Sequence, residues 1–252
     1  MEKIRKPFQG VFNIIRFNWH FYVMALTLII ILFSAAYCFE KPIQISSYSV
    51  GILIAFSTIV SLLVSYYIYD LSGLYDLNWI VSKGTENLIV NINAGFDETT
   101  VLLKNKFKSA EIIALDFYDP IKHTEISIKR ARKAYPSAAN TKQVITTNLP
   151  LADNSADKIF IIFSAHEIRN DEERSLFFKE LRRAIKPDGQ IYLMEHLRDT
   201  VNFLAYNIGF LHFYSKNTWL KTFDYAELII KQEIKITPFI STFILTKNGN
   251  TP

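Results

Sequence analysis

The chain has 252 residues, half of them apolar, and a formal net charge of +4. This length allows one large domain, or a smaller domain with an appendage. The single cysteine, Cys38, excludes an intramolecular disulfide framework and a cysteine-based metal site. We expect no bound metal. We also expect no nucleic-acid partner, because no basic cluster interleaved with aromatic residues stands out. The mild positive charge is typical of attraction to anionic lipid.

Two stretches without any charged residue, 21–39 and 42–69, lie near the start of the chain. Each reaches the ~20 residues that a helix needs to cross a bilayer. A secretory signal peptide is the alternative for the first stretch, but a second apolar stretch follows at once and no small-residue cleavage pattern appears. The sequence therefore predicts a transmembrane helical hairpin with an interfacial segment over residues 1–80.

Basic residues before the first span indicate how the hairpin is oriented. They are Lys3, Arg5, Lys6 and Arg16, whereas the turn between the spans offers only Glu40 and Lys41. Basic flanks stay in the cytoplasm, and two spans return the chain to its starting side. We expect a two-pass protein of the inner (cytoplasmic) membrane whose N-terminus and large domain, residues 81–252, are cytoplasmic.

After residue 72, short apolar runs alternate with amphipathic stretches, as in repeated β-α units. Predicted strands cover 88–93, 111–116, 141–146, 158–164 and 190–195, with helices at 97–107 and 171–185 between them. A helix at 216–231 precedes two strand-like runs, 232–237 and 239–246, which only Pro238 separates. So short a connection excludes a crossover helix and predicts an antiparallel hairpin at the sheet edge.

Ligands of open parallel sheets lie beyond the carboxyl ends of the strands, so the loops there should hold the site. The loop after the first strand reads Asn91-Ile92-Asn93-Ala94-Gly95-Phe96-Asp97. Asp116 closes the second strand, where a carboxylate can accept hydrogen bonds from both hydroxyls of a ribose. Ser164, Ala165, His166 and Glu167 follow the fourth strand.

Two further segments resemble class I S-adenosylmethionine-dependent methyltransferases: LPLADNSAD at 149–157 and ELRRAIKPDGQ at 180–190. The resemblance covers about residues 82–247. The first loop of that family usually reads acidic-x-Gly-x-Gly-x-Gly, whereas this chain keeps only the middle glycine, Gly95. The resemblance implies an α/β fold, a Rossmann-like seven-stranded methyltransferase sheet with a C-terminal antiparallel hairpin. It also implies S-adenosylmethionine as the cofactor.

The resemblance places the cofactor against the loops at the sheet edge. The implied contacts are Asn91, Asn93, Gly95, Asp97, Asp116, Phe117, Asn148 and Ser164. Asparagine is the next best residue after glycine for left-handed backbone, so we expect Asn93 to hold the turn, and Asp97 to cap the next helix. Many relatives recognise adenine through an acidic residue near Ile145 or Thr146, so that contact is expected here from backbone or from Asn148.

Methyl transfer needs mainly the alignment of a nucleophile with the departing sulfur. A hydroxyl nucleophile also benefits from a nearby base, and histidine is the usual choice. His166 and His196 are candidates; the alternative is that each is a hydrogen-bonded residue that shapes a loop. We expect Glu167 to orient a histidine or to bind a cationic amine, and Glu195 to pair with Arg198.

Residues 202–219 are dense in aromatic side chains. Core packing is the ordinary interpretation. However, relatives place a substrate lid between the fifth strand and the next helix, and this segment is too apolar for a solvated loop. We expect Phe203, Tyr206, His212 and Tyr214 to contact the substrate, with His212 as a third candidate base.

These observations predict methyl transfer from S-adenosylmethionine to a lipophilic, membrane-associated acceptor, either a phenolic or quinone-like group or a phospholipid amine. The expected partners are the lipid bilayer and this acceptor, and the oligomeric state stays open. One alternative is an NAD-dependent oxidoreductase, which the glycine pattern and the C-terminal hairpin disfavour. The other is a catalytically inactive methyltransferase-like membrane scaffold.

Overall fold

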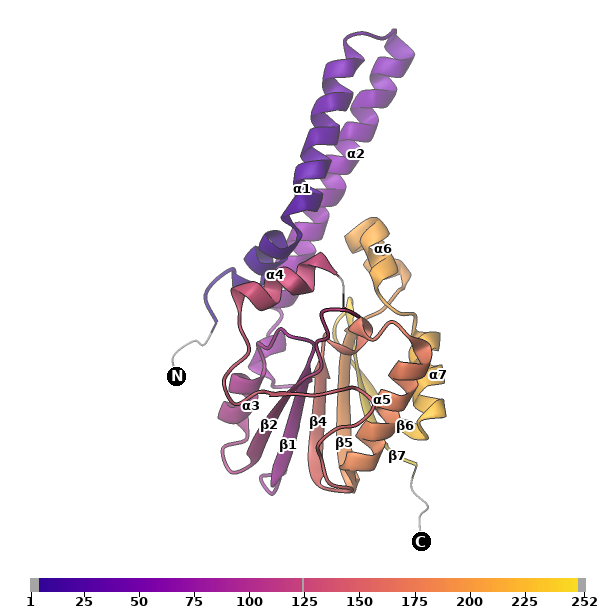
Figure 1. Cartoon of the computed structure of the whole chain (residues 1–252). Helices are drawn as coiled ribbons and strands as arrows, with labels where there is room; N and C mark the ends of the chain where they lie inside the picture. The colour runs from indigo at the N-terminus through magenta and orange to yellow at the C-terminus, as the bar shows by residue number, and fades with distance from the viewer. Residues whose placement is uncertain (1–4, 124, 249–252) are drawn as a thin grey trace.

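The computed structural model describes residues 5–123 and 125–248, in which a helical hairpin stands on an α/β domain (Figure 1). The strands are β1 (Leu88–Asn93), β2 (Glu111–Asp116), β3 (Lys142–Gln143), β4 (Ala156–Ile162), β5 (Ile185–His196), β6 (Leu228–Thr237) and β7 (Ile240–Lys247). Their order is β3-β2-β1-β4-β5-β7-β6. β1 to β5 are parallel, whereas β7 runs antiparallel to both β5 and β6. The predicted seven-stranded sheet with a C-terminal antiparallel hairpin is confirmed.

Two long helices form the hairpin, and shorter ones surround the sheet. The long helices are α1 (Gln9–Ala36) and α2 (Lys41–Tyr66), continued by η1 (Tyr67–Leu71) and η2 (Leu74–Asp76). The shorter ones are α3 (Thr100–Lys106), α4 (Ile126–Ala134), η3 (Ala165–Glu167), α5 (Asp171–Ala184), α6 (Thr200–Tyr206), η4 (Asn207–His212) and α7 (Lys216–Tyr225).

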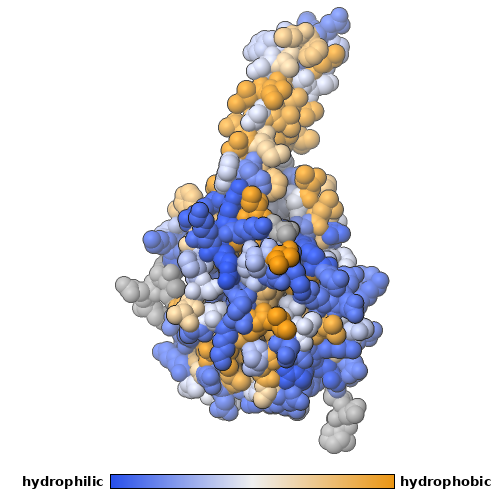
Figure 2. Space-filling model, viewed as in Figure 1, coloured by the Kyte–Doolittle hydropathy of each residue, from blue (hydrophilic) through white to orange (hydrophobic). Residues whose placement is uncertain are grey.

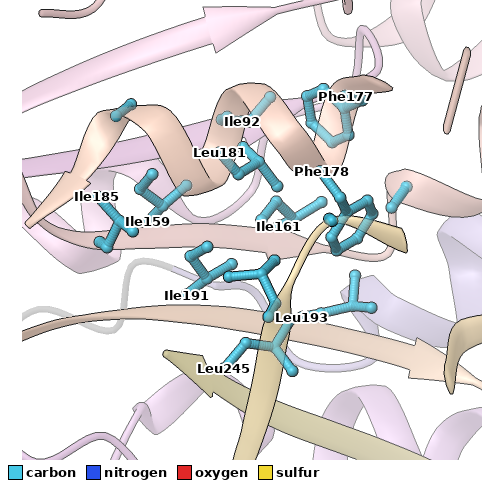
Figure 3. Close-up of a cluster of buried hydrophobic side chains, with 14 of the residues drawn as sticks. Ile92, Ile159, Ile161, Phe177, Phe178, Leu181, Ile185, Ile191, Leu193 and Leu245 are labelled. Atoms are coloured by element: carbon cyan, nitrogen blue, oxygen red, sulfur yellow. The ribbon is translucent and has the colours of Figure 1, made fainter. Parts of the chain in front are cut away.

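Alternating side chains of the strands fill a core on each face of the sheet. On one face Ile159 and Ile161 of β4 pack with Phe178 and Leu181 of α5 (Figure 3). On the other face Phe160 of β4 lies with residues of α3, and the whole group is fully or almost fully buried. The continuous apolar runs of the central strands reflect this burial on both faces.

Several predicted boundaries were wrong. The third strand shrinks to residues 142–143, and the helix predicted over 216–231 ends at Tyr225 because the chain from Leu228 pairs with β7. Leu77 and Ile80, which we expected to belong with the hairpin, are buried against the sheet. α4 and α6 were not predicted.

The hairpin helices, Gln9–Ala36 and Lys41–Asp76, are long and apolar enough to cross a membrane, with a mean hydropathy of 2.0 in each. Only 6% of the most apolar stretch of each is buried, unlike a core helix of a soluble domain. Figure 2 shows the apolar surface of the hairpin rising above a mostly hydrophilic domain. A break in α1 at Asn18 divides this exposed part from the base that packs on the domain.

One carboxylate, that of Asp70 in η1, joins the two helices at the base of the hairpin. Asp70 accepts hydrogen bonds from the backbone N–H groups of Gly10 and Val11, each at 2.9 Å. These N–H groups belong to the first turn of α1, where no helical partner exists. Gly10 approaches η1 so closely that a Cβ there would meet the Cβ of Tyr69 at 2.3 Å. Only glycine therefore permits this contact.

Candidate active site

A cavity of about 210 Å³ lies at the carboxyl ends of β1 and β4. The domain contributes Asn93, Ser164 and His166 to its wall. The base of the hairpin contributes Asn13 and Phe17 from α1, and α4 and η4 complete the lining. The edge of the sheet where a ligand is expected is thus roofed by the hairpin.

The loop after β1 is held by its own side chains. Asn93 accepts a hydrogen bond from the N–H of Gly95 at 2.9 Å, and its amide nitrogen is buried at the cavity without a partner among the described residues. The left-handed backbone that we expected at Asn93 is at Gly95, with φ +92°. Asn93 nevertheless holds the turn, through its side chain.

Two predicted cofactor contacts of this loop face away from the cavity. The carboxylate of Asp97 accepts hydrogen bonds from the backbone N–H groups of Thr99 and Thr100, each at 2.9 Å. Its predicted role in capping the start of the next helix is therefore supported. Asn91 is 1% exposed and donates to the hydroxyls of the same two threonines. Neither residue lines the cavity, and a direct cofactor contact by either stays a prediction.

Asp116 closes β2 as expected, but the protein itself binds its carboxylate. Arg132 of α4 forms an ion pair with it, Ser137 donates a hydrogen bond at 3.1 Å, and the N–H of Tyr118 donates one at 2.8 Å. Asp116 is 1% exposed and does not line the cavity at the ends of β1 and β4. A ribose can reach this carboxylate only if Arg132 moves.

A second cavity, of about 640 Å³, lies beside the segment that follows β2. Its wall includes Phe117 and Asn148, two of the predicted cofactor contacts, together with Tyr118 and Ile145. Aromatic and aliphatic faces beside an amide are suited to a flat heterocyclic base. Ala131 lines the first cavity and Tyr118 the second, so the neighbouring Arg132–Asp116 pair lies near both.

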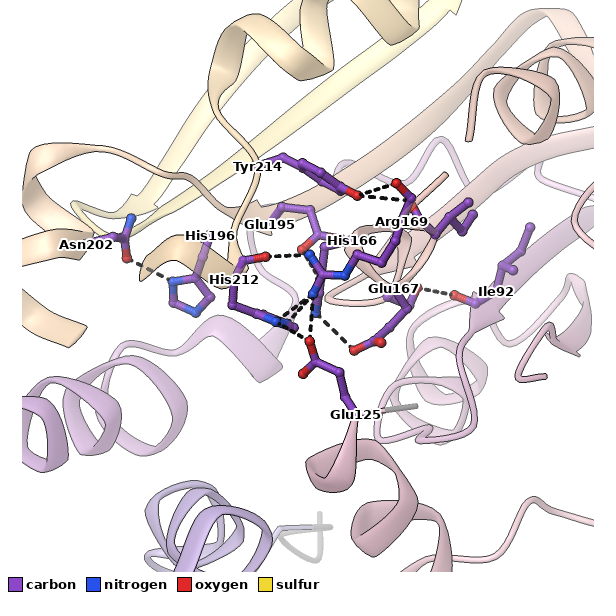
Figure 4. Close-up of polar contacts among 12 residues, drawn as sticks. Ile92, Glu125, His166, Glu167, Arg169, Glu195, His196, Asn202, His212 and Tyr214 are labelled. Carbon is purple, nitrogen blue, oxygen red and sulfur yellow. Dashed lines mark hydrogen bonds and ion pairs between the residues drawn. The ribbon is translucent and has the colours of Figure 1, made fainter. Parts of the chain in front are cut away.

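His166 lies between two carboxylates (Figure 4). Its Nδ1 is 2.7 Å from Oε2 of Glu195, and its Nε2 is 3.4 Å from Oε1 of Glu167. The expected partner of Glu195, Arg198, instead donates to the carbonyl oxygens of Phe213 and Leu211. Pairing Glu195 with Arg198 was therefore wrong.

Burial opposes a charge on His166, but the attraction of Glu195 and Glu167 outweighs it and raises the pKa of His166 to about 10. Burial likewise opposes the charge on Glu167, and the hydrogen bond and charge of His166 lower the pKa of Glu167 to about 2. Near neutral pH His166 is thus a proton donor in this arrangement, which disfavours the general-base role that we expected.

His196 does not reach the cavity. Its Nε2 accepts a hydrogen bond from the hydroxyl of Tyr69 at 2.8 Å, and its Nδ1 donates to Oδ1 of Asn202 at 3.1 Å. Its ring also stacks on Phe213, with centroids 4.7 Å apart. Burial lowers the pKa of His196 to about 4. The structure supports the alternative that this histidine shapes its surroundings.

Of the four predicted substrate contacts, only His212 lines the cavity. Phe203 is exposed on α6, and Tyr206 packs against buried residues at the base of the hairpin. The hydroxyl of Tyr214 donates to the carbonyl of Ile168 at 3.2 Å. Substrate contact by these three residues stays a prediction.

Residues that sequence reasoning missed come from segments distant in the chain. They are Glu125, Arg132 and Arg169 of the domain, and Asn13 and Phe17 of the hairpin base. The basic content of 129–133 was the only signal for Arg132. Contacts between separate elements leave no local pattern.

Residues 90–193 match the model of a family described as "Methyltransferase domain", which is less than half of the chain. No curated protein sequence matches this chain. Among solved structures, an S-adenosylmethionine-dependent methyltransferase from Aquifex aeolicus aligns with a TM-score of 0.52 at 15% identity, over 75% of this chain and 97% of that one. Human N-acetylserotonin methyltransferase, in complex with S-adenosylmethionine, aligns with a TM-score of 0.51 at 14% identity, over 77% of this chain and 56% of that one.

At these identities the two structures show the fold alone. The domain therefore has the Rossmann-like methyltransferase fold, and its central segment matches a methyltransferase domain. Fold and site together define the class as a methyltransferase-like protein. The acceptor does not follow from either comparison.

The lowered pKa of His196 predicts a loss of stability in acid. Unfolding returns the pKa from about 4 to about 6.5, so the unfolded chain binds more protons between these values and the stability falls as the pH falls through them. The expected loss from pH 7 to pH 5 is about 2 kcal/mol. Denaturant unfolding of the detergent-solubilised protein and of a His196→Gln variant measures it.

The variant should lose less stability than the native protein over this interval, because glutamine does not titrate. The pKa of His166 is raised, so its contribution to stability has the opposite pH dependence: it is present below pH 6.5 and is lost as the pH rises above that value. Parallel curves for the two proteins would show that His196 is not the group responsible.

Proposed function

We propose that this protein is a methyltransferase, held at the cytoplasmic face of a membrane, that transfers a methyl group from S-adenosylmethionine to a lipophilic acceptor. One observation carries the proposal. The cavity at the carboxyl ends of β1 and β4 is built jointly from the methyltransferase-like domain and the base of the apolar hairpin. A substrate dissolved in the bilayer would meet the site where the hairpin leaves the membrane.

S-adenosylmethionine is the cofactor that the family match and the fold neighbours support. We infer that the two cavities form one cleft for it, with the Asp116–Arg132 pair between them. The buried amide of Asn93 offers an unused donor at one end, and the aromatic face of Tyr118 and the aliphatic side chain of Ile145 line the other. Gly95 leaves no room for a Cβ, which would meet Nη1 of Arg132 at 2.8 Å. Asp116 has the right position for the ribose, once Arg132 releases it.

The closed cavity of about 210 Å³ is smaller than the ~300–1,000 Å³ typical of ligand sites, which supports movement of α4 on loading. The sulfonium supplies an already electrophilic methyl group, so alignment is the main task of the protein. Asn93 and Ser164 would position the cofactor. His166 and Glu167 would contact the acceptor, as donor and acceptor of hydrogen bonds respectively.

The hairpin and α6 support a membrane location. α6 and η4 lie beside the hairpin (Figure 1) and expose apolar side chains there, at Val201, Phe203, Leu204, Ile208 and Leu211. The basic N-terminal flank supports the two-pass topology with a cytoplasmic domain. A phenolic or quinone-like acceptor, or a phospholipid amine, agrees with this location.

The proposal is tested with the full chain in vesicles of bacterial lipid extract and S-adenosylmethionine labelled in the methyl group. Label should accumulate in the organic-solvent fraction with the native protein and not with Asp116→Ala. Mass spectrometry of the labelled fraction then identifies the acceptor. Absence of label from the organic fraction, or its appearance only in water-soluble products, would contradict a lipophilic acceptor.

The second candidate function is that of a catalytically inactive membrane scaffold. The ion pair between Arg132 and Asp116 favours it, because the protein itself occupies the carboxylate that would bind the ribose. The two functions differ in what happens when Arg132 is removed. If the site binds the cofactor and Arg132 only competes with it for Asp116, Arg132→Leu should tighten the binding of S-adenosylhomocysteine. Calorimetry should show a gain of about tenfold, or about 1.4 kcal/mol.

The control for this change is Lys133→Leu, which removes an exposed charge from the same helix and should leave the affinity unaltered. Asp116→Ala should weaken binding by at least about tenfold, since a charged hydrogen-bond acceptor is lost. No heat from any of these proteins would favour the scaffold.

The exposed apolar side chains of α6 and η4 predict that these helices contact the membrane. Leu204 of α6 and Ile208 of η4 are 68% and 81% exposed. Replacing both with glutamine should lower the turnover of the lipophilic acceptor in vesicles several-fold and leave the binding of S-adenosylhomocysteine unchanged. Ile229→Gln, at an exposed position on β6, is the control. Equal turnover of the double variant and the control would show that α6 and η4 do not take part in acceptor capture.

A further inference from the structure

We propose that His166, Glu167 and His212 form a binding site for a divalent transition-metal ion, with zinc as the first choice. Each of the three residues offers a ligand atom, and these atoms lie within 4.8 Å of one another. His166 and Glu167 come from η3, after β4, whereas His212 ends η4 (Figure 4). Two segments 43 or more residues apart in the sequence thus converge on one point.

The spacing is close to that of a metal site. Ligand atoms about 2.1 Å from a tetrahedral ion lie about 3.4 Å from one another. Nε2 of His166 and Oε1 of Glu167 are already 3.4 Å apart. The other pairs of ligand atoms lie within 4.8 Å, so His212 has to move inward by about 1.4 Å at most to reach this spacing.

Both histidines are oriented as metal ligands usually are, with a carboxylate on the other ring nitrogen. Glu195, 1% exposed, lies 2.7 Å from Nδ1 of His166. Glu125 lies 2.7 Å from Nδ1 of His212. Each carboxylate favours Nδ1 as an N–H donor. The ion then takes the place of the proton that Nε2 of His166 carries beside Glu167, and Arg169, whose Nη2 is 2.6 Å from Nδ1 of His212, has to withdraw before Glu125 alone fixes that nitrogen. The buried Glu195 behind His166 is an observation independent of the clustering itself.

The fixed charges also favour a dication. Three carboxylates surround the cluster, those of Glu125, Glu167 and Glu195, against one guanidinium, that of Arg169. Nη2 of Arg169 lies 2.6 Å from Nδ1 and 3.1 Å from Nε2 of His212, so it competes with an ion at this ring. Its side chain is 38% exposed and has a path to solvent. An ion would displace it from His212.

Two imidazole nitrogens and one carboxylate oxygen select zinc or a neighbouring transition metal rather than magnesium. All three ligand residues line the cavity, so the remaining coordination position faces the space where the acceptor is proposed to lie. With the ion bound, the ion contacts the acceptor in place of the side chains of His166 and Glu167. The sequence led us to expect no bound metal, and His212 is distant in the chain from the other two ligands. Metal binding is measurable directly, so its outcome is separate from that of methyl transfer.

The test uses the full-length, detergent-solubilised protein after treatment with a chelator. Calorimetry with Zn²⁺ should show one ion per chain, and Mg²⁺ under the same conditions should show none. Co²⁺ should give the visible absorption of a tetrahedral site. Glu167→Gln and His212→Asn should each weaken Zn²⁺ binding at least about tenfold, and Glu195→Gln, which acts on a positioning residue, by about 10- to 100-fold.

Two controls keep the result independent of folding. His20→Gln removes a histidine outside the cluster and should retain the ion. Arg169→Leu should bind Zn²⁺ several-fold more tightly, which a misfolded protein cannot mimic, whereas Arg182→Leu, which removes an arginine of α5 paired with Glu227, should not. Equal binding by the ligand variants and the native protein, equal binding of Mg²⁺, or no gain in Arg169→Leu would each overturn the proposal.

Discussion

The site depends on the carboxylate of Asp70, which joins the beginning of α1 to the end of α2. By accepting two backbone N–H groups, at Gly10 and Val11, it satisfies donors that have no partner within the helix. The close approach of Gly10 to Tyr69 fixes the start of α1 against η1, and Asn13 and Phe17 further along α1 line the cavity at the carboxyl ends of the strands. The break at Asn18 turns the exposed remainder of the helix away. Without the contact between Asp70 and α1, the cavity would lack the part of its wall that α1 contributes.

α4 connects that roof to the proposed cofactor cleft. Arg130 donates to the carbonyl of Phe17 at 2.7 Å, and the hydroxyl of Tyr135 donates to Asn13 at 2.9 Å. Between them in sequence, Arg132 holds Asp116. The element that occupies the ribose position is therefore the same element that packs on the hairpin. A movement of α4 that frees Asp116 must also loosen contacts with α1, so loading of the cleft and the seating of the hairpin are linked.

Much of the sheet could be predicted, because buried parallel strands are continuous apolar runs; β1 and β2 have the predicted bounds. The positions of Asn93 and His166 at the cavity also follow from topology, since ligand loops lie at the carboxyl ends of strands. What a side chain binds there depends on packing between distant elements. No local sequence pattern predicts the ion pair between Arg132 and Asp116, nor the position of His212 beside Glu167. The departures are thus concentrated at contacts between elements, not within them.

The end of β5 shows how one strand serves both the site and the hairpin. Successive side chains of a strand point to opposite faces, so Glu195 and His196 are directed apart. Glu195 reaches His166 at the cavity, whereas His196 receives the hydroxyl of Tyr69 from η1 and is joined to Asn202 of α6. Because a shift of the hairpin base would pull on His196, it would displace the adjacent Glu195 and with it the orientation of His166. In physical terms the hairpin is a structural part of the site, and the position of the polar cluster depends on how the hairpin is seated.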